Sequence, residues 1–192
     1  MDKFLIVGLG NPEKKYDNTK HQMGFMTIDV ILKNLGLELD QNKFNGAFTS
    51  FKDGNSTVFV AKPLTYMNLS GEFIAPFMKY NNIPLENLLV IYDDMDTKVG
   101  SLKIKPKGSS GGQNGMKNII NLLKSENVRR IKIGIGRPGV DKPAEDKKDF
   151  VLSKLSPRDA ELIYPVINKA AQLALSFPRV EFEKLMNLAN TK

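Results

Sequence analysis

A short apolar run that breaks off in closely spaced glycines constrains the fold of this chain most strongly. Residues 4–7 are all apolar, as in a strand buried on both faces, and Gly8 and Gly10 end the run and predict a sharp bend. Apolar residues then recur at helical spacing over residues 25–35, and Gly36 is placed to end that helix. A buried strand followed at once by an amphipathic helix predicts an α/β fold.

The single histidine of the chain lies where this helix is expected to begin. Thr19 and Gln22 have the spacing of a capping box, in which each side chain bonds the backbone N–H of the other residue, and this predicts a helix start at Thr19. His21 would then lie in the first helical turn, beside the carboxyl end of the strand. The positive end of the helix dipole disfavours an imidazolium there, so His21 is expected to stay available as a base.

The rest of the chain alternates between strand and helix patterns. Apolar or alternating segments predict strands over residues 46–52, 57–62, 88–92, 101–105 and 128–135. Helical spacing predicts helices around residues 73–78 and over 116–123, 156–176 and 180–188. Pro76 is expected to kink the first of these helices or to delay its start, and Pro165 is expected to bend the third. The mixed-charge residues 142–149 are expected to form a surface loop with 136–139. Because a hairpin at 53–56 adds an antiparallel strand, we expect a single α/β domain over residues 1–192, with a twisted mixed central sheet flanked by helices.

Charge and composition narrow the function classes. The 192 residues include 28 Lys and Arg against 21 Asp and Glu, a net charge of +7 with a pI near 9.4, which favours a polyanionic partner such as nucleic acid. The absence of cysteine excludes disulfides, thiol catalysis and thiolate metal sites, and it is compatible with a cytoplasmic protein. No apolar run approaches the roughly 20 residues of a membrane span, so no membrane partner is expected.

Polar side chains follow several predicted strands, at the edge where open α/β sheets gather functional groups. The three segments are residues 11–21, 93–96 and 108–114, and Asn68 lies just beyond a fourth strand. A neutral imidazole accepts a proton from water when a carboxylate such as Asp93 orients it and stabilises the charge that it acquires. Asparagine amides polarise a carbonyl without adding a competing charge.

Each of these features also has an ordinary structural interpretation. A lone histidine is usually a surface or core residue, and residues 93–96 could be a surface turn or a magnesium site, although no second carboxylate cluster supports a metal. The glycines of 108–115 could form a flexible connection or a phosphate cradle, since Lys105 and Lys107 precede them and a helix follows. The first glycines of the chain lack the third glycine of a dinucleotide fingerprint, and no nucleophile elbow of the G-x-S-x-G type occurs.

Six short motifs follow one another in a fixed order. They are Val-Gly-Leu-Gly-Asn-Pro at 7–12, Tyr-x-x-Thr-Lys-His-x-x-Gly-Phe at 16–25, Pro-x-Thr-Tyr-Met-Asn-x-Ser-Gly at 63–71, Asp-Asp-Met-Asp at 93–96, Gly-Gly-Gln-Asn-Gly-Met at 111–116 and Gly-Ile-Gly-Arg-Pro-Gly at 134–139. In order and spacing, from residue 4 to about residue 175, the chain resembles the bacterial peptidyl-tRNA hydrolases.

The resemblance implies hydrolysis of the ester that joins a peptide to the 3′-terminal ribose of tRNA, in peptidyl-tRNA released prematurely from ribosomes. It implies a metal-independent enzyme without cofactors that is normally monomeric and cytoplasmic. By position, His21 matches the catalytic base of the family, and Asp93 matches the carboxylate that orients it. The substrate-binding positions are Asn11, Tyr16, Tyr66, Met67, Asn68 and Asn114. The side chains expected to face tRNA phosphates are Lys103, Lys105, Lys107, Arg130 and Lys132.

Four positions depart from the family pattern. Gln113 stands where the family commonly has a second histidine, Lys20 replaces the usual Arg, Gln22 the usual Asn, and Glu13 the usual Gly. The main alternative is a binding module of the same fold that holds RNA without cleaving it, and a nucleotide-dependent oxidoreductase is a more distant one. Because His21, Asp93 and Asn11 are all present, we expect an active enzyme.

Overall fold

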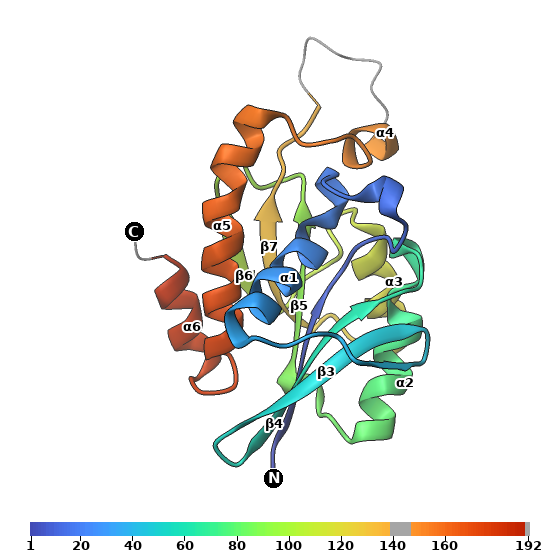
Figure 1. Ribbon diagram of the computed structural model, residues 1–192, viewed down its shortest axis with the longest axis vertical. Helices are drawn as coiled ribbons and strands as arrows, with labels where there is room; N and C mark the ends of the chain where they lie inside the picture. Colours follow the sequence, from blue (N-terminus) through green and yellow to red (C-terminus); the bar gives the residue numbers. More distant parts are fainter. Residues whose placement is uncertain (139–146, 191–192) are drawn as a thin grey trace.

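Seven strands form one mixed sheet in the computed structural model, which describes residues 1–138 and 147–190 (Figure 1). The strands are β1 (Lys3–Gly8), β2 (Gln41–Lys43), β3 (Gly46–Asp53), β4 (Ser56–Pro63), β5 (Leu88–Asp94), β6 (Leu102–Lys105) and β7 (Arg129–Gly134). They lie in the order β2-β3-β4-β1-β5-β7-β6, and β4, β1, β5 and β7 run parallel. The pairs β2–β3, β3–β4 and β6–β7 are antiparallel. The predicted mixed α/β fold is confirmed.

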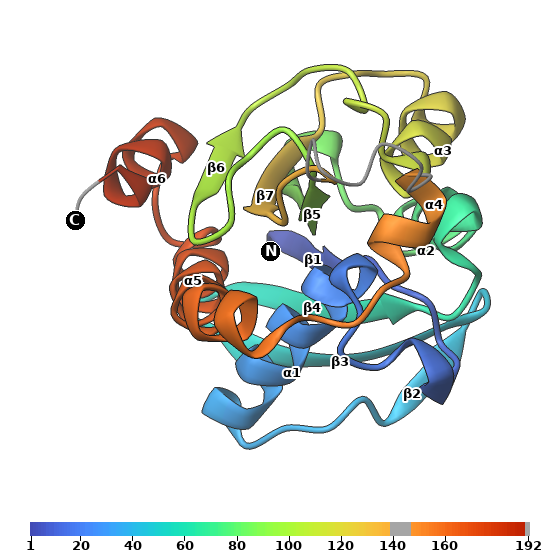
Figure 2. The ribbon, with the colours of Figure 1, turned by 90° about the horizontal axis from the view of Figure 1, so that it is seen from above.

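Helices cover both faces of this sheet. Those in the described part of the chain are α1 (Met23–Leu35), α2 (Gly71–Asn81), α3 (Asn114–Leu123), α4 (Lys147–Val151), α5 (Pro157–Ser176) and α6 (Phe182–Ala189). Figure 2 shows α1 and α5 on one face and α2 and α3 on the other, with α6 beside the edge strand β6. Among these helices, none is long and apolar enough to cross a membrane.

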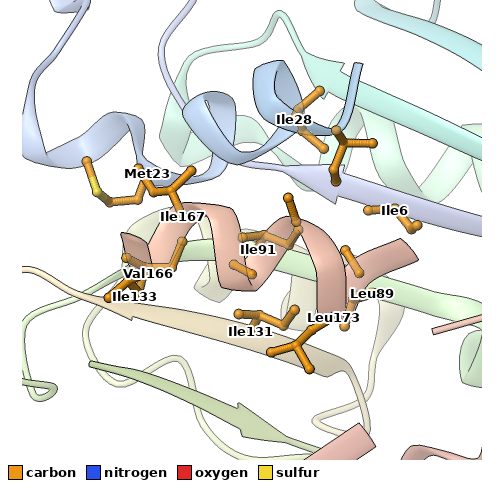
Figure 3. Packing of buried hydrophobic residues seen from close by; sticks show 14 of the residues in the cluster. Ile6, Met23, Ile28, Leu89, Ile91, Ile131, Ile133, Val166, Ile167 and Leu173 are labelled. Atoms are coloured by element: carbon orange, nitrogen blue, oxygen red, sulfur yellow. The ribbon is translucent and has the colours of Figure 1, made fainter. Parts of the chain in front are cut away.

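The alternation of side chains along each strand supplies a core on either face of the sheet. In β1, Ile6 packs on the α1–α5 face, whereas Leu5 and Val7 pack on the α2–α3 face. Figure 3 shows the first of these cores, in which α1 and α5 together cover the strand residues Ile6, Leu89, Ile91, Ile131 and Ile133. Full burial of one such aliphatic side chain stabilises the fold by about 1.5–3 kcal/mol. Burial on both faces explains the continuous apolar runs in β1 and β5.

The glycines around α1 are required by close packing rather than by unusual backbone angles. A Cβ at Gly8 would lie 2.1 Å from the backbone oxygen of Gly24, and a Cβ at Gly24 would lie 2.3 Å from the backbone oxygen of Ile91. Neither Gly8 nor Gly24 has a positive φ. The start of α1 therefore lies directly against the ends of β1 and β5, and this contact brings the residues that precede α1 to the end of β5.

The first α-helix begins later than the capping box predicts, and the box does not form. A 3-10 helix, η2 (Lys20–Gln22), precedes α1, so His21 lies in a 3-10 turn rather than in the first α-helical turn. Thr19 makes no capping bond, and the Gln22 side chain bonds the backbone of Asn11 instead. The predicted capping box was wrong because the backbone of Asn11 offers the Gln22 side chain both a donor and an acceptor, whereas the N–H of Thr19 offers only a donor.

Other departures from the predicted elements are local. The helix α2 begins at Gly71 and continues through Pro76, so its start is not delayed to that proline. The exposed edge strand β2 has no apolar pattern to predict it, and α4 occupies part of the stretch expected as a surface loop. Residues 136–138 of that expected loop form neither helix nor strand, and its part within residues 139–146, including Gly139 of the sixth motif, lies outside the described residues.

Candidate active site

A cavity of about 710 Å³ lies at the carboxyl ends of the parallel strands. Its walls come from the loop after β1, the 3-10 helix η3 (Met67–Leu69), the end of β5 and the start of α3. All eight residues expected to catalyse the reaction or bind substrate line it: Asn11, Tyr16, His21, Tyr66, Met67, Asn68, Asp93 and Asn114. The fold therefore brings these strand-end side chains together at one site.

A hydrogen bond joins His21 to Asp93. Nδ1 of His21 lies 2.8 Å from Oδ2 of Asp93, and the two side chains are 11% and 2% exposed. The other carboxylate oxygen, Oδ1, accepts a hydrogen bond from Nε2 of Gln113 at 3.1 Å. Because Nδ1 of the neutral ring donates to the carboxylate, Nε2 is the ring nitrogen that is left to accept a proton.

Asp93 decides the direction in which the pKa of His21 moves. Burial is the largest single influence and lowers this pKa, but the charge of Asp93 and its hydrogen bond together outweigh burial. The pKa of His21 is therefore raised above its ordinary value of 6.5. This corrects the expectation drawn from the helix dipole, because a full charge at 2.8 Å exceeds the partial charge at a helix end. Asp93 stabilises the imidazolium that forms when His21 takes up a proton.

The carboxamide of Asn11 is fixed by its neighbours. Oδ1 of Asn11 accepts a hydrogen bond from the backbone N–H of Met67 at 2.8 Å, and the Gln22 amide bonds the backbone N–H and C=O of Asn11 at 2.6 and 2.9 Å. With its oxygen engaged, Asn11 retains its NH₂ group as a donor toward the cavity that it lines. Asn68 and Asn114 line the same cavity and are exposed. The role of Gln22 was missed because its spacing from Thr19 indicated a cap.

Glu13 connects two loops at the cavity. The Tyr66 hydroxyl donates a hydrogen bond to Oε1 of Glu13, and Nζ of Lys15 lies 3.3 Å from Oε2 of Glu13. The bond from Tyr66 is the main cause that lowers the pKa of Glu13. Lys15 also lies 5.1 Å from the ring centroid of Tyr16. The departure from Gly at position 13 thus ties the loop after β1 to the loop after β4.

The acidic run at the end of β5 is explained by separate partners. Oδ2 of Asp94 accepts a hydrogen bond from the Thr97 hydroxyl at 2.5 Å and lies 3.4 Å from Nζ of Lys132. Asp96 pairs with Arg137, whose hydrogen bond lowers the pKa of Asp96. Within residues 1–138 and 147–190, no three acidic, histidine or cysteine side chains are grouped as a metal site.

The lysines expected to face tRNA phosphates gather at the β6 edge of the sheet. Lys103, Lys105 and Lys107 are exposed. Lys103 is directly opposite Lys132 in the β6–β7 register, and side chains opposite each other on antiparallel strands share one face. Lys132 itself is only 13% exposed at its side chain and is paired with Asp94.

The expectation that Arg130 faces tRNA is wrong. Arg130 is 1% exposed, and its guanidinium donates hydrogen bonds at 2.7–3.0 Å to the backbone carbonyls of Gly108, Ser109, Glu126 and Val128. Because β6 is antiparallel to β7, β6 ends at Lys105, opposite Arg130, and residues 106–112 then return toward the cavity. This return segment covers Arg130, whose side chain holds its backbone in place.

A wall that the sequence did not predict is formed by α4 and the residue after it. The lining residues from this segment are Lys147, Lys148, Val151 and Leu152. Lys20, next to His21, donates from Nζ to Oγ of Ser153 at 2.6 Å and lies 4.6 Å from the ring centroid of Phe150. Lys20, in place of the usual Arg, thus fastens the α4 segment to the turn that carries His21.

Comparisons with known proteins match the chain over nearly its full length. A family model described as peptidyl-tRNA hydrolase matches residues 5–192. The peptidyl-tRNA hydrolase of Ureaplasma parvum serovar 3 is 50% identical over 191 residues, which cover 99% of this chain and all of that protein. The peptidyl-tRNA hydrolase of Bacillus subtilis strain 168 is 44% identical over 193 residues, covering 98% and 99% of the two chains.

Structural comparison gives the same result. The crystal structure of peptidyl-tRNA hydrolase from Acinetobacter baumannii matches this fold with a TM-score of 0.89 at 31% identity, over 98% of this chain and 94% of that one. Because identities of this size extend over almost the whole chain, and the same fold recurs with them, the chain belongs to the peptidyl-tRNA hydrolase family.

Proposed function

We propose that this chain hydrolyses the ester between a peptide, or an N-blocked aminoacyl group, and the 3′-terminal ribose of tRNA, with His21 as the general base. The family to which the chain belongs releases tRNA from peptidyl-tRNA. The observation that carries the proposal is the 2.8 Å bond between His21 and Asp93 in a cavity lined by asparagine amides. Peptidyl-tRNA released prematurely from ribosomes is the substrate, and hydrolysis returns tRNA and peptide for reuse.

The proposed reaction uses the two nitrogens of His21 for different tasks. Nδ1 donates to Asp93, while Nε2 takes a proton from water as the water oxygen attacks the carbonyl carbon of the ester. The negative charge that develops on the carbonyl oxygen is stabilised by neutral donors, of which the NH₂ group of Asn11 is the one held in place by its neighbours. The bond to the ribose oxygen then breaks, and the imidazolium returns its proton to that leaving oxygen.

The cavity is suited to a blocked amino group rather than to a free one. A free α-amino group is largely protonated near neutral pH, whereas a peptide nitrogen is a neutral amide. Of the described residues that line the cavity, the carboxylates are Asp93, bonded to His21, and Asp94, paired with Lys132. An ammonium group would therefore be buried without an anionic partner, which disfavours free aminoacyl-tRNA. The amides of Asn11 and Asn68 suit a peptide group.

The tRNA is proposed to lie along the β6 edge, where Lys103, Lys105 and Lys107 are exposed, with Lys132 nearer the cavity. We also propose a single domain over residues 1–192 that acts as a monomer in the cytoplasm. The catalytic and substrate-binding side chains named above all come from one chain, and the substrate is a product of translation. Sedimentation of the protein with and without tRNA tests the monomer.

Incubation with two matched substrates tests the proposed activity. N-acetyl-aminoacyl-tRNA should release its acyl group in the presence of the protein, and the same tRNA with a free amino group should be spared. A protein that binds the acetylated tRNA in a gel-shift assay but releases no acyl group would instead be a binding module, and the hydrolase proposal would fail.

A further inference from the structure

The side-chain amide of Gln113 is bonded at both ends. Gln113 is the N-cap residue of α3, and its Oε1 accepts a hydrogen bond from the backbone N–H of Met116 at 2.7 Å. Its Nε2 donates to Oδ1 of Asp93 at 3.1 Å and lies 3.2 Å from the sulfur of Met67. Because one end accepts and the other donates, only one orientation of the amide satisfies both partners, and the side chain is fixed.

Asp93 is consequently shared between two donors. Oδ2 bonds His21 and Oδ1 bonds Gln113, and within the described part of the chain these are the hydrogen-bond donors to a carboxylate that is almost fully buried. A buried carboxylate is costly to keep ionised without such bonds. With Oδ1 held by Gln113, the plane of the carboxylate is set, and Oδ2 is directed at the imidazole.

We propose that Gln113 is a positioning residue of this site, whose amide holds the Asp93 carboxylate in the plane that orients His21. The inference rests on the function proposed above for His21 and Asp93. It also explains a glutamine in place of the histidine common in the family. An amide donates the same hydrogen bond without carrying a charge, so the chain keeps a single imidazole at the site.

The shared carboxylate couples Gln113 to the protonation of His21. The bond and the charge of Asp93 raise the pKa of His21, and both act most strongly while Oδ2 is directed at Nδ1 of the imidazole. Loss of the Gln113 bond frees the carboxylate to rotate and weakens its bond to the imidazole, so burial counts for more and the pKa of His21 should fall. The other charged or titratable groups near the pair are Asp94, Lys132, Lys20, Lys147, Lys148, Tyr16, Tyr66, Tyr92 and Arg130. Substitution at Gln113 changes none of them, so their influence is common to all proteins compared.

Two substitutions separate this role from helix capping. Gln113→Asn places a strongly favoured N-cap residue at the start of α3 but shortens the side chain by one methylene, out of reach of Asp93. Gln113→Met keeps the length of the side chain and removes both bonds. Ser156→Ala is the matched control, because Ser156 caps α5 through its hydroxyl and does not line the cavity.

The readouts are the pKa of His21 and the kinetics of ester hydrolysis. The single histidine gives one imidazole signal in an NMR titration of the protein without a histidine tag. We expect both Gln113 variants to lower the pKa of His21. Both should also lower kcat about 5-fold on the alkaline plateau, with a smaller change in KM. Ser156→Ala should lower the melting temperature and change neither quantity.

The possible outcomes are distinct. If Gln113→Asn matches the wild type while Gln113→Met is impaired, Gln113 acts only as a cap and the inference is wrong. An unchanged or raised pKa of His21 in both folded variants would also overturn it. Because the titration needs no turnover, it decides the role of Gln113 even if the wild-type protein hydrolyses no ester, an outcome that would refute the proposed function separately.

Discussion

Replacement of Asp93 by asparagine should both slow hydrolysis and move its pH dependence to lower pH. The substitution keeps the side-chain size and an oxygen that accepts from Nδ1 of His21, but it removes the negative charge 2.8 Å away. Burial then prevails, so the pKa of His21 falls below its ordinary value of 6.5 instead of lying above it. The neutral imidazole is the active form and exists above this pKa. The acidic limb of kcat/KM against pH should therefore shift to lower pH.

The size of the rate loss follows from the same bond. A hydrogen bond to a charged group contributes about 1.5–3 kcal/mol, and about 1.4 kcal/mol corresponds to a tenfold change in rate. If the full contribution is realised when the imidazolium forms, kcat on the alkaline plateau should fall about 10- to 150-fold. The loss should be smaller than that caused by removing His21, because Nε2 still accepts a proton.

Hydrolysis of N-acetyl-aminoacyl-tRNA, measured for wild type and Asp93→Asn from about pH 5 to about pH 9, tests both parts. NMR titration of the single histidine gives the pKa of His21 independently of turnover. An acidic limb that stays in place, or moves to higher pH, would refute the control of His21 by Asp93. A folded variant as inactive as His21→Ala would mean that Asp93 does more than orient the imidazole.

Three further predictions test separate parts of the molecule. Arg130→Met should lower the free energy of unfolding by about 2–4 kcal/mol, because four backbone carbonyls lose their donor. Urea titration measures this, and an equal effect of the neighbouring Arg129→Met would contradict it. KM for tRNA substrates should rise with salt concentration, and Lys103→Ala or Lys105→Ala should each reduce the slope of log KM against log salt concentration by about one unit at most. A KM that does not depend on salt would contradict the proposed tRNA contact at the β6 edge. Asn11→Asp should narrow the rate difference between N-acetylated and free aminoacyl-tRNA, since a carboxylate offers the ammonium a partner. If a folded, active variant keeps the wild-type rate difference, Asn11 does not contribute to the rejection of the free amino group.

The buried strands and the gathering of the cavity residues were predictable because they depend on local signals. Residues 4–7 and 88–92 are apolar throughout, and such an unbroken run is typical of a strand that is covered on both faces. Parallel strands end at a common edge, so polar residues that follow them meet in space. This rule was sufficient to bring Asn11, His21 and Asp93 together.

The errors arose where a segment is shaped by remote parts of the chain. Alternation along β7 correctly separates Arg130 from Ile131, but it does not reveal that residues 108–109 return across that face and bury the guanidinium. The strand β2 and the helix α4 are short and mostly exposed, so neither carries an apolar period.

The amides of Gln22 and Gln113 show a second limit of sequence reasoning. Each amide bonds a donor and an acceptor at once, and for each at least one partner is far away in the chain, Asn11 for Gln22 and Asp93 for Gln113. Spacing rules consider only near neighbours. They indicated a cap at Gln22 and no specific partner for Gln113.

The central claim is that His21 is the general base, and the turnover of His21→Ala tests it most directly. The variant should keep the wild-type circular dichroism spectrum and bind N-acetyl-aminoacyl-tRNA, while kcat falls about 100-fold or more. A folded variant that binds this substrate and hydrolyses it at a rate close to that of the wild type would contradict the account.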